Sequence, residues 1–549
     1  MKKYFLLIIS MSLFLPVLAQ EENWEEDGEI EDAQVVIEKS MTIELPQASR
    51  NFEKIPPPPV STESKDVGYN FNSYKLDVGT TQPPVRVFSI KEEPLDKYYS
   101  NLVNAGFGNY ITPYLEIFSS SKRSERYLVN LHAKHLSSRN GPVDDQNSGT
   151  SENEVGITGK LFSENLTLGG GINYDRNKYY WYGYAPQQEV NRDSIKQVYN
   201  NINLEASLGN HNQYSDLSFK AGTSFNYLTT SADASEMIFN LDLNLKYLLD
   251  EGFYASITTD LMLSQKEDLE SINRTLFRVR PTFQYILEPF NLEGGFNIVH
   301  ENDTLTNLDK LHFYPFVKAS YTFAEELVFY GQLDGDIEAN TLRSVTNENP
   351  FLKPGTPIFH TNRTMRIKGG VKGRLLDRIG YNGGFSLGNY KNMIYYANSA
   401  LDSTQFDIIY DTGNSVMFNF FGEIGYSLQD RFRINLRTDF YTFDTGVAED
   451  AWHMPRYKAT ASAYYNLFGK ILFDADFYWM GGIKAINLQS GTERTLKDIT
   501  DLSLKIDYLF SDQFSAFIDL NNMFGSNYQR FMNYPSRGFM AMVGISYSF

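Results

Sequence analysis

The final stretch of the chain, residues 538–549, alternates between two kinds of side chain. One face is apolar or aromatic and the other is small or weakly polar; the first holds Phe539, Ala541, Val543, Ile545, Tyr547 and Phe549, and the second holds Met540, Met542, Gly544, Ser546 and Ser548. A period of two is that of a β-strand. Strands of membrane barrels alternate in this way between lipid and lumen. A strand of a soluble sandwich shows the same alternation, so the number of repeats decides between the two folds.

The same alternation returns many times between Tyr98 and the end of the chain. Examples, given by their apolar positions, are Phe239, Leu241, Leu243, Leu245, Tyr247 and Leu249; Phe277, Val279, Phe283 and Tyr285; Phe329, Leu333 and Ile337; and Met365, Ile367, Val371 and Leu375. The predicted strands run to roughly 11–16 residues, about twice the usual length in soluble domains. A strand that crosses a bilayer at a tilt needs about 9–11 residues. The length of the strands therefore favours a membrane barrel.

The predicted connections fall into a short class and a long class, which alternate strictly along the chain. The short connections are 163–165, 250–251, 288–289, 324–325, 377–378, 429–430, 468–469 and 511–512, and the long ones are 139–152, 185–194, 340–362, 399–412, 446–455, 489–497 and 525–537. Outer-membrane barrels have short periplasmic turns and long extracellular loops. The pattern predicts an all-β fold over residues 98–549, a transmembrane antiparallel β-barrel of about 22 strands with both ends in the periplasm. Pro281 and Pro315 fall inside predicted strands, where we expect bulges.

Composition agrees with this fold and excludes other classes. The chain has 549 residues, with 37 Tyr, 40 Phe, 39 Gly and no Cys, so it can form neither a disulfide nor a thiolate metal site. Its formal net charge of −18 argues against a nucleic-acid partner, which requires a basic surface. After the first 20 residues no apolar run approaches the length of about 18 residues that a membrane helix needs.

The N-terminal region is expected to be separate from the barrel. Residues 1–19 resemble a signal peptide: Lys2 and Lys3 precede an apolar run, and small residues end at Ala19. A retained N-terminal anchor is the alternative interpretation. Export past the inner membrane, together with the predicted barrel, leads us to expect the protein in the outer membrane of a Gram-negative envelope. Residues 20–97 are acidic and proline-rich, which is typical of a periplasmic tail or linker, or of a segment that enters the barrel or docks a partner.

The sequence offers no catalytic constellation. His132 and His135 are three apart on a predicted strand, so they point to opposite faces, and nothing near His300 or His312 completes a site. No nucleophile elbow, phosphate loop or zinc-protease motif occurs. We therefore expect no enzyme activity, no catalytic, cofactor-binding or metal-binding residues, and no cofactor.

Two groups of side chains have both a structural and a functional interpretation. Acidic and basic residues face each other across a predicted hairpin, as an ion ladder that braces the wall or as a charge-selective path: Asp334, Asp336 and Glu338 opposite Arg366, Lys368, Lys372 and Arg374, with Arg274, Arg278 and Arg280 as a second basic row. The cluster from Tyr179 to Tyr182, with Tyr184, predicts an interfacial aromatic girdle, and a carbohydrate-stacking site is the alternative.

Several motifs resemble the barrel of TonB-dependent receptors, and in part those of Bacteroidota. They are Leu520-Asn521-Asn522-Met523-Phe524-Gly525-Ser526-Asn527-Tyr528, Tyr534-Pro535-Ser536-Arg537-Gly538, the end at Tyr547-Ser548-Phe549, Asn349-Pro350-Phe351-Leu352-Lys353-Pro354, Phe107-Gly108-Asn109-Tyr110-Ile111-Thr112-Pro113 and His135-Leu136-Ser137-Ser138. The resemblance covers nearly the whole predicted barrel, and it implies transport across the outer membrane.

The family has a globular plug domain before its barrel, and residues 20–97 are too short and too polar for one. A lumen of about 22 strands is normally plugged. We expect a substitute to fill it, and the loops 340–362 and 399–412 are the candidates within the barrel. The favoured function is transport with a substitute or partner-supplied plug. The alternative is an occluded structural or accessory subunit of a multi-protein outer-membrane complex. The expected partners are outer-membrane lipid and other envelope proteins bound through residues 20–97 or the outer loops, and coupling of this chain alone to TonB is not expected.

Overall fold

A computed structural model describes residues 99–549, apart from residues 123, 186–187, 211–214, 304–309 and 325. The expected signal peptide, the segment 20–97 and Tyr98 lie outside the described residues. No helix within the described part of the chain is long and apolar enough to cross a membrane.

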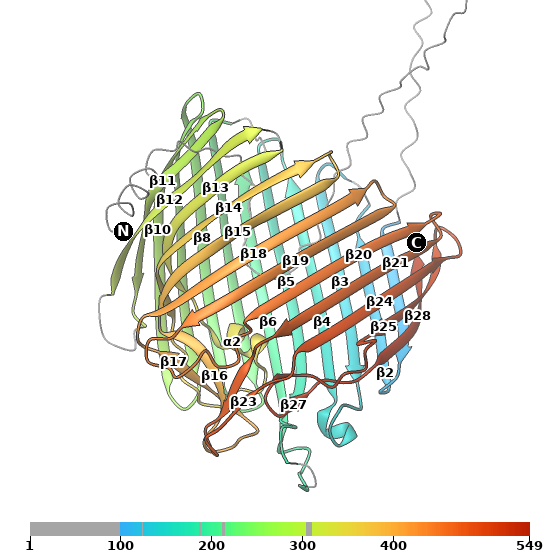
Figure 1. Cartoon of the computed structure of the whole chain (residues 1–549). Coiled ribbons are helices and arrows are strands. Elements are labelled where there is room, and N and C mark those ends of the chain that lie inside the picture. The colour runs from blue at the N-terminus through green and yellow to red at the C-terminus, as the bar shows by residue number, and fades with distance from the viewer. Residues whose placement is uncertain (1–98, 123, 186–187, 211–214, 304–309, 325) are drawn as a thin grey trace, which may run out of the picture. The chain divides into compact units, whose positions relative to one another are not determined.

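Within the described residues, one 22-stranded antiparallel sheet forms the wall of a barrel (Figure 1). Its strands are β1 (Asn101–Gly108), β2 (Thr112–Ser120), β3 (Tyr127–Ser138), β4 (Thr150–Phe162), β5 (Leu166–Tyr180), β6 (Lys196–Asn210), β7 (Leu217–Thr230), β8 (Ser235–Asp250), β9 (Phe253–Glu267), β10 (Ser271–Leu287), β11 (Phe290–Glu301), β12 (Leu311–Ala324), β13 (Leu327–Glu338), β14 (Thr361–Leu375), β15 (Ile379–Lys391), β18 (Ser415–Leu428), β19 (Phe432–Asp444), β20 (Tyr457–Leu467), β21 (Ile471–Gly481), β24 (Ile499–Leu509), β25 (Phe514–Asn521) and β28 (Met540–Ser548).

The shorter elements all lie in the connections at one end of this barrel. They are the 3₁₀ helix η1 (Asp145–Ser148), the helix α2 (Leu342–Glu348) and the strands β16 (Met393–Asn398), β17 (Phe406–Asp411), β22 (Lys484–Asn487), β23 (Thr492–Thr495), β26 (Gln529–Phe531) and β27 (Tyr534–Pro535). Strands β17, β16, β22 and β23 form a small sheet of their own. The sequence around residues 406–410 is therefore strand, but it is not part of the wall.

The barrel closes where its first strand pairs with its last. The register of β1 on β28 runs from Leu102 opposite Ser548 to Gly108 opposite Met542. The Asn101 amide donates to the Phe549 carbonyl at 3.1 Å, and the Phe549 amide donates to the Asn101 carbonyl at 3.0 Å. The closed barrel confirms the predicted fold class and the strand number. Closure leaves no free edge where β1 and β28 meet.

The alternation along the last strand is the one predicted from the sequence. Val543, Ile545 and Tyr547 are exposed on the outer face of β28. Phe517 on the neighbouring β25 is buried on the inner side, where its ring lies next to Gly544. The outward faces of the other strands also carry exposed apolar residues, which together form a hydrophobic band around the wall. Such a band is the outer surface of a membrane barrel.

Connections at one end of the barrel are short, and most of those at the other end are long. We call these the turn end and the loop end. The turn end holds 163–165, 251–252, 288–289, 376–378 and 468–470, among others, and the loop end holds 139–149, 181–195, 339–360, 392–414, 445–456, 482–498 and 522–539. The predicted strict alternation of lengths is wrong at three places, because 109–111, 231–234 and 268–270 are short connections at the loop end.

Neither proline inside a strand produces the expected bulge. Around Pro281 the register of β10 on β11 is the same before and after the proline, with Val279 opposite Ile298 and Thr282 opposite Gly295. Pro315 stays in unbroken register with Phe296. The register of β12 on β13 shifts instead between Thr322 and Ala324, and β13 shifts against β14 between Asp334 and Asp336.

The wall opens between β12 and β13 toward the loop end. Strand β12 pairs with β11 along its length, but within the described residues it pairs with β13 only from Val317 to Ala324. Beyond Asp334 the strand β13 turns inward, and the Asn297 side chain donates to the Gly335 carbonyl at 2.9 Å. Ile337, which the alternation predicts on the lipid face, is 1 % exposed and packs inside the barrel with Leu276 and Val299. We call the gap between β12 residues 311–316 and the end of β13 the wall split.

The wall split can be tested with cysteine pairs, because the chain has no cysteine of its own. Val317 and Leu333 are paired across β12 and β13, so Val317→Cys with Leu333→Cys is expected to form a disulfide on mild oxidation. Phe313→Cys with Ile337→Cys continues the same register into the split and is expected to stay reduced, because a disulfide needs Cα atoms within about 7 Å. Counting free thiols by mass spectrometry checks both pairs, and equal oxidation of the two would mean a closed wall.

Candidate functional site: the loop cap and the charged inner wall

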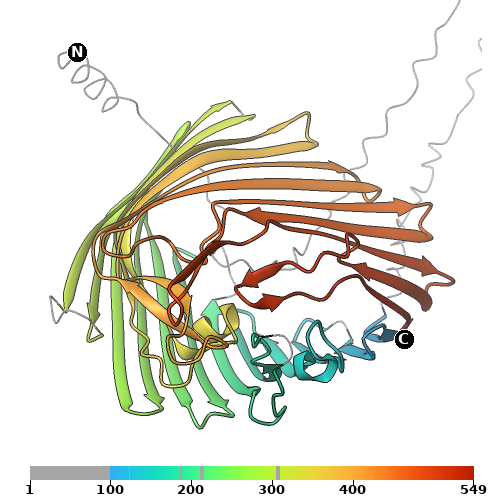
Figure 2. The same cartoon turned by 60° about the horizontal axis from the view of Figure 1, so that its bottom comes forward.

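Five loop-end connections fold back over the barrel and pack against one another. We call residues 339–360, 392–414, 445–456, 482–498 and 522–539 together the loop cap. Figure 2, which brings the loop end forward, shows the helix α2 and the small strands of the cap within the ring of wall strands. The predicted filling loops, 340–362 and 399–412, both belong to this cap.

The helix α2 begins at a capping box. Thr341 is the N-cap: the Ser344 amide donates to the Thr341 hydroxyl oxygen at 3.0 Å, and the Thr341 amide donates to the Ser344 hydroxyl oxygen at 2.9 Å. These two bonds satisfy donors that a helix start leaves unpaired. The helix ends at Asn349, because the following Pro350 disfavours a helical conformation before it. Leu342 and Val345 form its buried face.

The cap has an aromatic core that joins segments far apart in the sequence. The rings of Phe351 and Tyr534 stack with centroids 3.7 Å apart, and Phe406 and Phe531 lie edge-on at 5.4 Å. The buried apolar members of this core are Tyr180, Trp181, Tyr184, Ile195, Tyr199, Leu228, Ala234, Leu342, Val345, Phe351, Leu352, Ile358, Tyr396, Phe406, Phe531 and Tyr534. A core of this kind excludes water from the middle of the cap.

The aromatic cluster at the end of β5 lies in this core or against it, and its predicted role was wrong. Tyr180, Trp181 and Tyr184 are buried beneath the cap, so they form neither an exposed girdle at the membrane interface nor an open carbohydrate-stacking site. The prediction failed because the loops that cover them come from distant parts of the chain.

The motif Asn349 to Pro354 is joined to β17 by one isolated parallel β-bridge. Leu352 pairs in parallel with Phe406, the Phe406 amide donates to the Phe351 carbonyl at 3.0 Å, and the Lys353 amide donates to the Phe406 carbonyl at 2.9 Å. From the wall, the Tyr199 hydroxyl donates to the Pro350 carbonyl at 2.8 Å. The motif thus ties the cap to β6 and β17 through its backbone.

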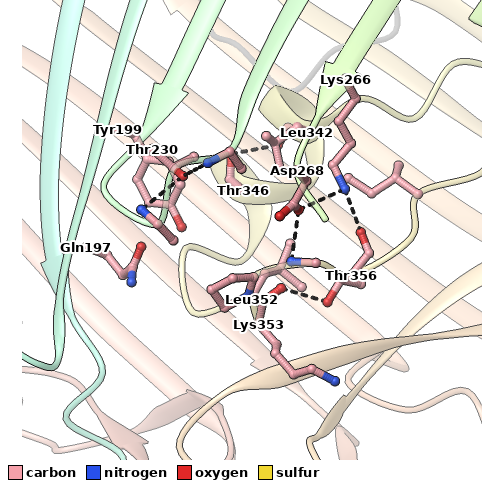
Figure 3. A pocket seen from close by; sticks show the side chains of 15 residues that line it. Gln197, Tyr199, Thr230, Lys266, Asp268, Leu342, Thr346, Leu352, Lys353 and Thr356 are labelled. Atoms are coloured by element: carbon pink, nitrogen blue, oxygen red, sulfur yellow. Dashed lines mark hydrogen bonds and ion pairs between the residues drawn. The ribbon is translucent and has the colours of Figure 1, made fainter. Parts of the chain in front are cut away.

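A buried ion pair holds the other side of this segment against the wall (Figure 3). Lys266, at the end of β9, donates to the Thr356 carbonyl at 2.9 Å and lies 3.3 Å from Asp268. The same Asp268 carboxylate accepts a bond from the Gly355 amide at 2.9 Å. The cavity beside them measures about 30 Å³, which is room for about one water. This place is therefore a joint between loop and wall, too small to hold a solute.

His453 joins three cap loops while remaining uncharged. Its Nδ1 lies 2.7 Å from the Tyr396 carbonyl and donates to it, while its Nε2 accepts from the Met532 amide at 3.3 Å. Complete burial lowers the pKa of His453 to about 3. Since the ring both donates and accepts, it must be neutral to make both bonds.

Asp411 closes the loop that follows β17. Its carboxylate accepts the Gly446 and Val447 amides and the Ser415 hydroxyl, each at 2.7 Å. Hydrogen bonds to the charged form lower the pKa of Asp411 against the opposing effect of burial, which is the largest single influence. The connection between β19 and β20 is thereby fixed to the start of β18.

The charged inner wall is an ion network that extends beyond a single hairpin. The Arg366 guanidinium donates two hydrogen bonds, of 2.8 and 3.2 Å, to the Asp334 carboxylate, which confirms that pair of the predicted ladder. Asp336 instead binds Arg278 at 2.9 Å, across the inside of the barrel. Opposite charges on neighbouring strands help to hold their register.

Three further pairs complete this network. Glu338 binds Arg363 at 2.8 Å across the same β13–β14 hairpin as the predicted ladder, although Arg363 is not among the basic residues predicted there. In the second basic row, Arg274 binds Glu236 at 2.9 Å and lies 3.4 Å from Asp303. These pairs brace the inward-turned end of β13 and the loops beside it, and they give the inner wall a polar, charged surface.

The histidines lie as their spacing predicts. His132 turns toward Glu116 at 3.1 Å, while His135 bonds to Asn153 at 2.7 Å on the other face. His312 lies 3.3 Å from Glu301. Among the residues that the structure describes, no three His, Asp or Glu side chains are placed to hold one metal ion.

Comparison with known proteins agrees with this geometry at the level of the fold. No protein-family model and no curated protein matches the chain. Its structure is similar to the FrpB iron transporter from Neisseria meningitidis, F3-3 variant, with a TM-score of 0.64, 10% sequence identity and coverage of 83% of this chain and 82% of that one.

Two other solved structures show the same likeness. The siderophore receptor PirA from Acinetobacter baumannii has a TM-score of 0.63, with 10% identity and coverage of 83% and 81% of the two chains. The copper transporter OprC has a TM-score of 0.61, with 10% identity and coverage of 83% and 82%. The chain thus forms a barrel like those of TonB-dependent receptors, and at this identity the likeness establishes the fold alone. The described residues contain no plug domain.

The joint between Lys266 and Asp268 predicts a measurable loosening of the cap. Lys266→Met leaves Asp268 buried without its cation, and breaking a buried pair costs about 3–5 kcal/mol. We expect hydrogen exchange at the Gly355 amide, which bonds to Asp268, to rise by roughly 10²–10³-fold. Lys353→Met is the matched control, because that lysine pairs with Asp407 while 29% exposed and should change exchange only slightly. Unchanged exchange at Gly355 in Lys266→Met would contradict the joint.

The neutral His453 predicts that the cap weakens in acid. In an opened cap the ring regains its ordinary pKa of about 6.5, so the opened form takes up a proton below that pH while the closed form does not until about pH 3. The stability of the closed cap is therefore complete above about pH 6.5 and falls below it by about 1.4 kcal/mol, or tenfold in opening, for each pH unit.

Hydrogen exchange at the Met532 amide, corrected for its intrinsic rate, measures this opening between pH 7 and 4. In His453→Gln the tenfold increase in cap opening for each unit of falling pH should disappear. In His135→Gln, which lies outside the cap, it should remain. An equal pH dependence in His453→Gln and in the unaltered protein would assign the effect to another group.

Proposed function

We propose that this protein takes part in transport across the outer membrane, with the loop cap in the place of a plug. The observation that carries the proposal is the inward folding of the loops 339–360 and 392–414 onto an aromatic core at the mouth of the barrel. A wide barrel without such a cover would leave a large hole in the membrane. The cap thus acts as the gate of the barrel.

The likeness of the barrel to transport proteins supports the same function. The similar structures are those of an iron transporter, a siderophore receptor and a copper transporter. Substrates do not carry over at 10% identity, so we infer only the class of activity. The same likeness supports a protein that is not an enzyme and that contacts outer-membrane lipid.

The inner wall supports a polar or charged solute. Arginines of β10 and β14 face the lumen, and several of them are engaged by Asp or Glu, as Arg366 is by Asp334 and Arg278 by Asp336. Such a wall offers hydrogen-bonding partners to a hydrated solute and none to an apolar one. The ion pairs thereby serve both as a brace and as the lining of the path.

For the N-terminal region we propose the roles that the sequence predicts. We infer that residues 1–19 direct export, that residues 20–97 lie in the periplasm or the lumen, and that the barrel occupies residues 98–549. Other envelope proteins would then meet the chain through residues 20–97 or through the outer loops. We do not expect this chain alone to couple to TonB.

A second candidate function is favoured by the tightness of the cap. Its core residues are almost fully buried, as in the interior of a soluble domain, and a gate that opens often should be less well packed. This packing suits an occluded barrel that serves as a structural or accessory subunit of an outer-membrane complex.

Planar-bilayer conductance separates the two functions. We expect the unaltered protein to give small steady channels, and a variant in which residues 339–360 are replaced by an Asn-Gly turn to give several-fold larger ones, because β13 and β14 are neighbours that a short turn can join. Deletion of residues 20–96 tests the N-terminal segment as a further obstruction. Gln489→Ala with Ser490→Ala, at the exposed tip of the β22–β23 connection, is the control and should leave the conductance unchanged. Transport is contradicted if the barrel stays silent with both obstructions removed while it still copurifies with other envelope proteins.

A further inference from the structure

Among the residues that the structure describes, none pairs with the edge of β12 that faces the wall split. The Glu301 amide donates to the Lys310 carbonyl, so the even-numbered residues of β12 direct their backbone groups toward β11. The odd-numbered residues Leu311, Phe313 and Pro315 therefore direct theirs into the split. Any other residue at position 315 would direct an unpaired backbone N–H into the split. Proline has no backbone N–H, so Pro315 avoids this cost. The sequence at this edge is suited to remaining open.

A cavity of about 450 Å³ lies behind this edge. Its lining combines Leu311 and Phe313 from the lipid-facing side of β12 with His312 and Tyr314 from the inner side of the same strand. Asn362 and Lys391, which are register partners at the ends of β14 and β15, complete its polar part. Leu311 and Phe313 are 52% and 64% exposed on the outside. The cavity thus connects the two sides of the wall, with an apolar lip and a polar interior.

The position of the split matches the border of the apolar band. The outward face of β12 is apolar from Phe323 through Val317 to Leu311, and on the neighbouring β11 the band ends at the exposed His300. The split occupies the loop-end part of this band, where acyl chains give way to headgroups. Backbone groups that face hydrocarbon without a partner are costly, so a polar group must reach this edge.

The two carboxylates that line the cavity are already engaged within the protein. Glu301 already faces His312 at 3.3 Å and accepts the Asp303 amide at 2.7 Å. Asp303 faces Arg274 at 3.4 Å and accepts the His360 amide at 3.1 Å. Within the described residues Lys391 has no ion pair.

A neutral donor lies beside that lysine. The Tyr314 hydroxyl donates to the Asn362 side-chain oxygen at 2.8 Å, which leaves the amide –NH₂ of Asn362 as a donor toward a ligand. The cavity therefore offers one cation and one neutral donor to an incoming acceptor.

We propose that the wall split is a binding site for a lipid with an anionic, phosphate-bearing headgroup. The headgroup occupies the cavity beside Lys391 and Asn362, and an acyl chain leaves the barrel between β12 and β13 past Phe313. A headgroup in this place also supplies polar contacts to the open edge of β12. The site does not depend on whether the barrel transports a solute.

A strand from a partner is the other conceivable occupant of an open edge. Only three residues of β12 face the split, and one of them is a proline without a donor, so a pairing strand would gain few hydrogen bonds. The volume behind the edge is also wider and more polar than an added strand requires. These features favour the lipid.

Photo-crosslinking in nanodiscs tests the proposal with the full chain. One probe is phosphatidylglycerol with a diazirine in its acyl chain, and the comparison probe is phosphatidylcholine with the same acyl chain and no net charge. Peptide mass spectrometry measures labelling at residues 311–316 of β12. We expect the anionic probe to label this edge at least fivefold more than the zwitterionic probe, and more than it labels the outward face of β28.

Variants of Lys391 connect the labelling to the cavity. Lys391→Gln should lower labelling of the edge by the anionic probe about fivefold to tenfold, and Lys391→Arg should retain it. Lys318→Gln, on the inner face of the same strand outside the cavity, is the matched control. Equal labelling by the two probes, or labelling indifferent to Lys391→Gln, overturns the proposal. So does p-benzoylphenylalanine in place of Phe313 that cross-links in cells to a polypeptide instead of lipid.

Discussion

Backbone hydrogen bonding in the membrane is the constraint on which the rest of this structure depends. In hydrocarbon each N–H and C=O must find a partner within the protein, which an antiparallel sheet achieves only by closing on itself. The bonds between Asn101 and Phe549 complete that closure. Once the wall is closed, its outer face must be apolar and its inner face can be charged. The exposed Val543 and the buried pair of Arg366 with Asp334 follow from this single requirement.

The loop cap follows from the width of the barrel. A ring of 22 strands encloses more space than wall side chains can fill. Loops of the chain lie within this ring, and their aromatic residues Phe351, Phe406 and Tyr534 belong to a core of their own. Lys266 of the wall and His453 of the cap are buried polar groups, and each is satisfied by a partner in a cap loop. The cap is therefore built by the rules of a soluble domain inside a membrane protein.

The wall split is the one place in the described wall where closure gives way. It arises because β13 turns inward after Asp334, where Arg278 and Asn297 hold its end against the inner face of β10 and β11. The proline of β12 lies at the edge that this turn exposes. In a soluble protein, water would hydrogen-bond to the unpaired backbone groups of such an edge. In a membrane a polar group other than water must do so. The cavity at Lys391 is placed to accept one.

The sequence by itself determined the elements of this fold, because each depends on neighbouring residues. Period-two alternation identified the strands and their outward faces, and short polar connections identified the turns. Contacts between segments that lie far apart in the sequence were not predictable. The burial of Trp181, the inward turn of Ile337 and the pairing of Asp336 with Arg278 each depend on residues far away in the chain. Local chemistry thus set the strands, whereas only the tertiary structure decided what covers the barrel and where its wall opens.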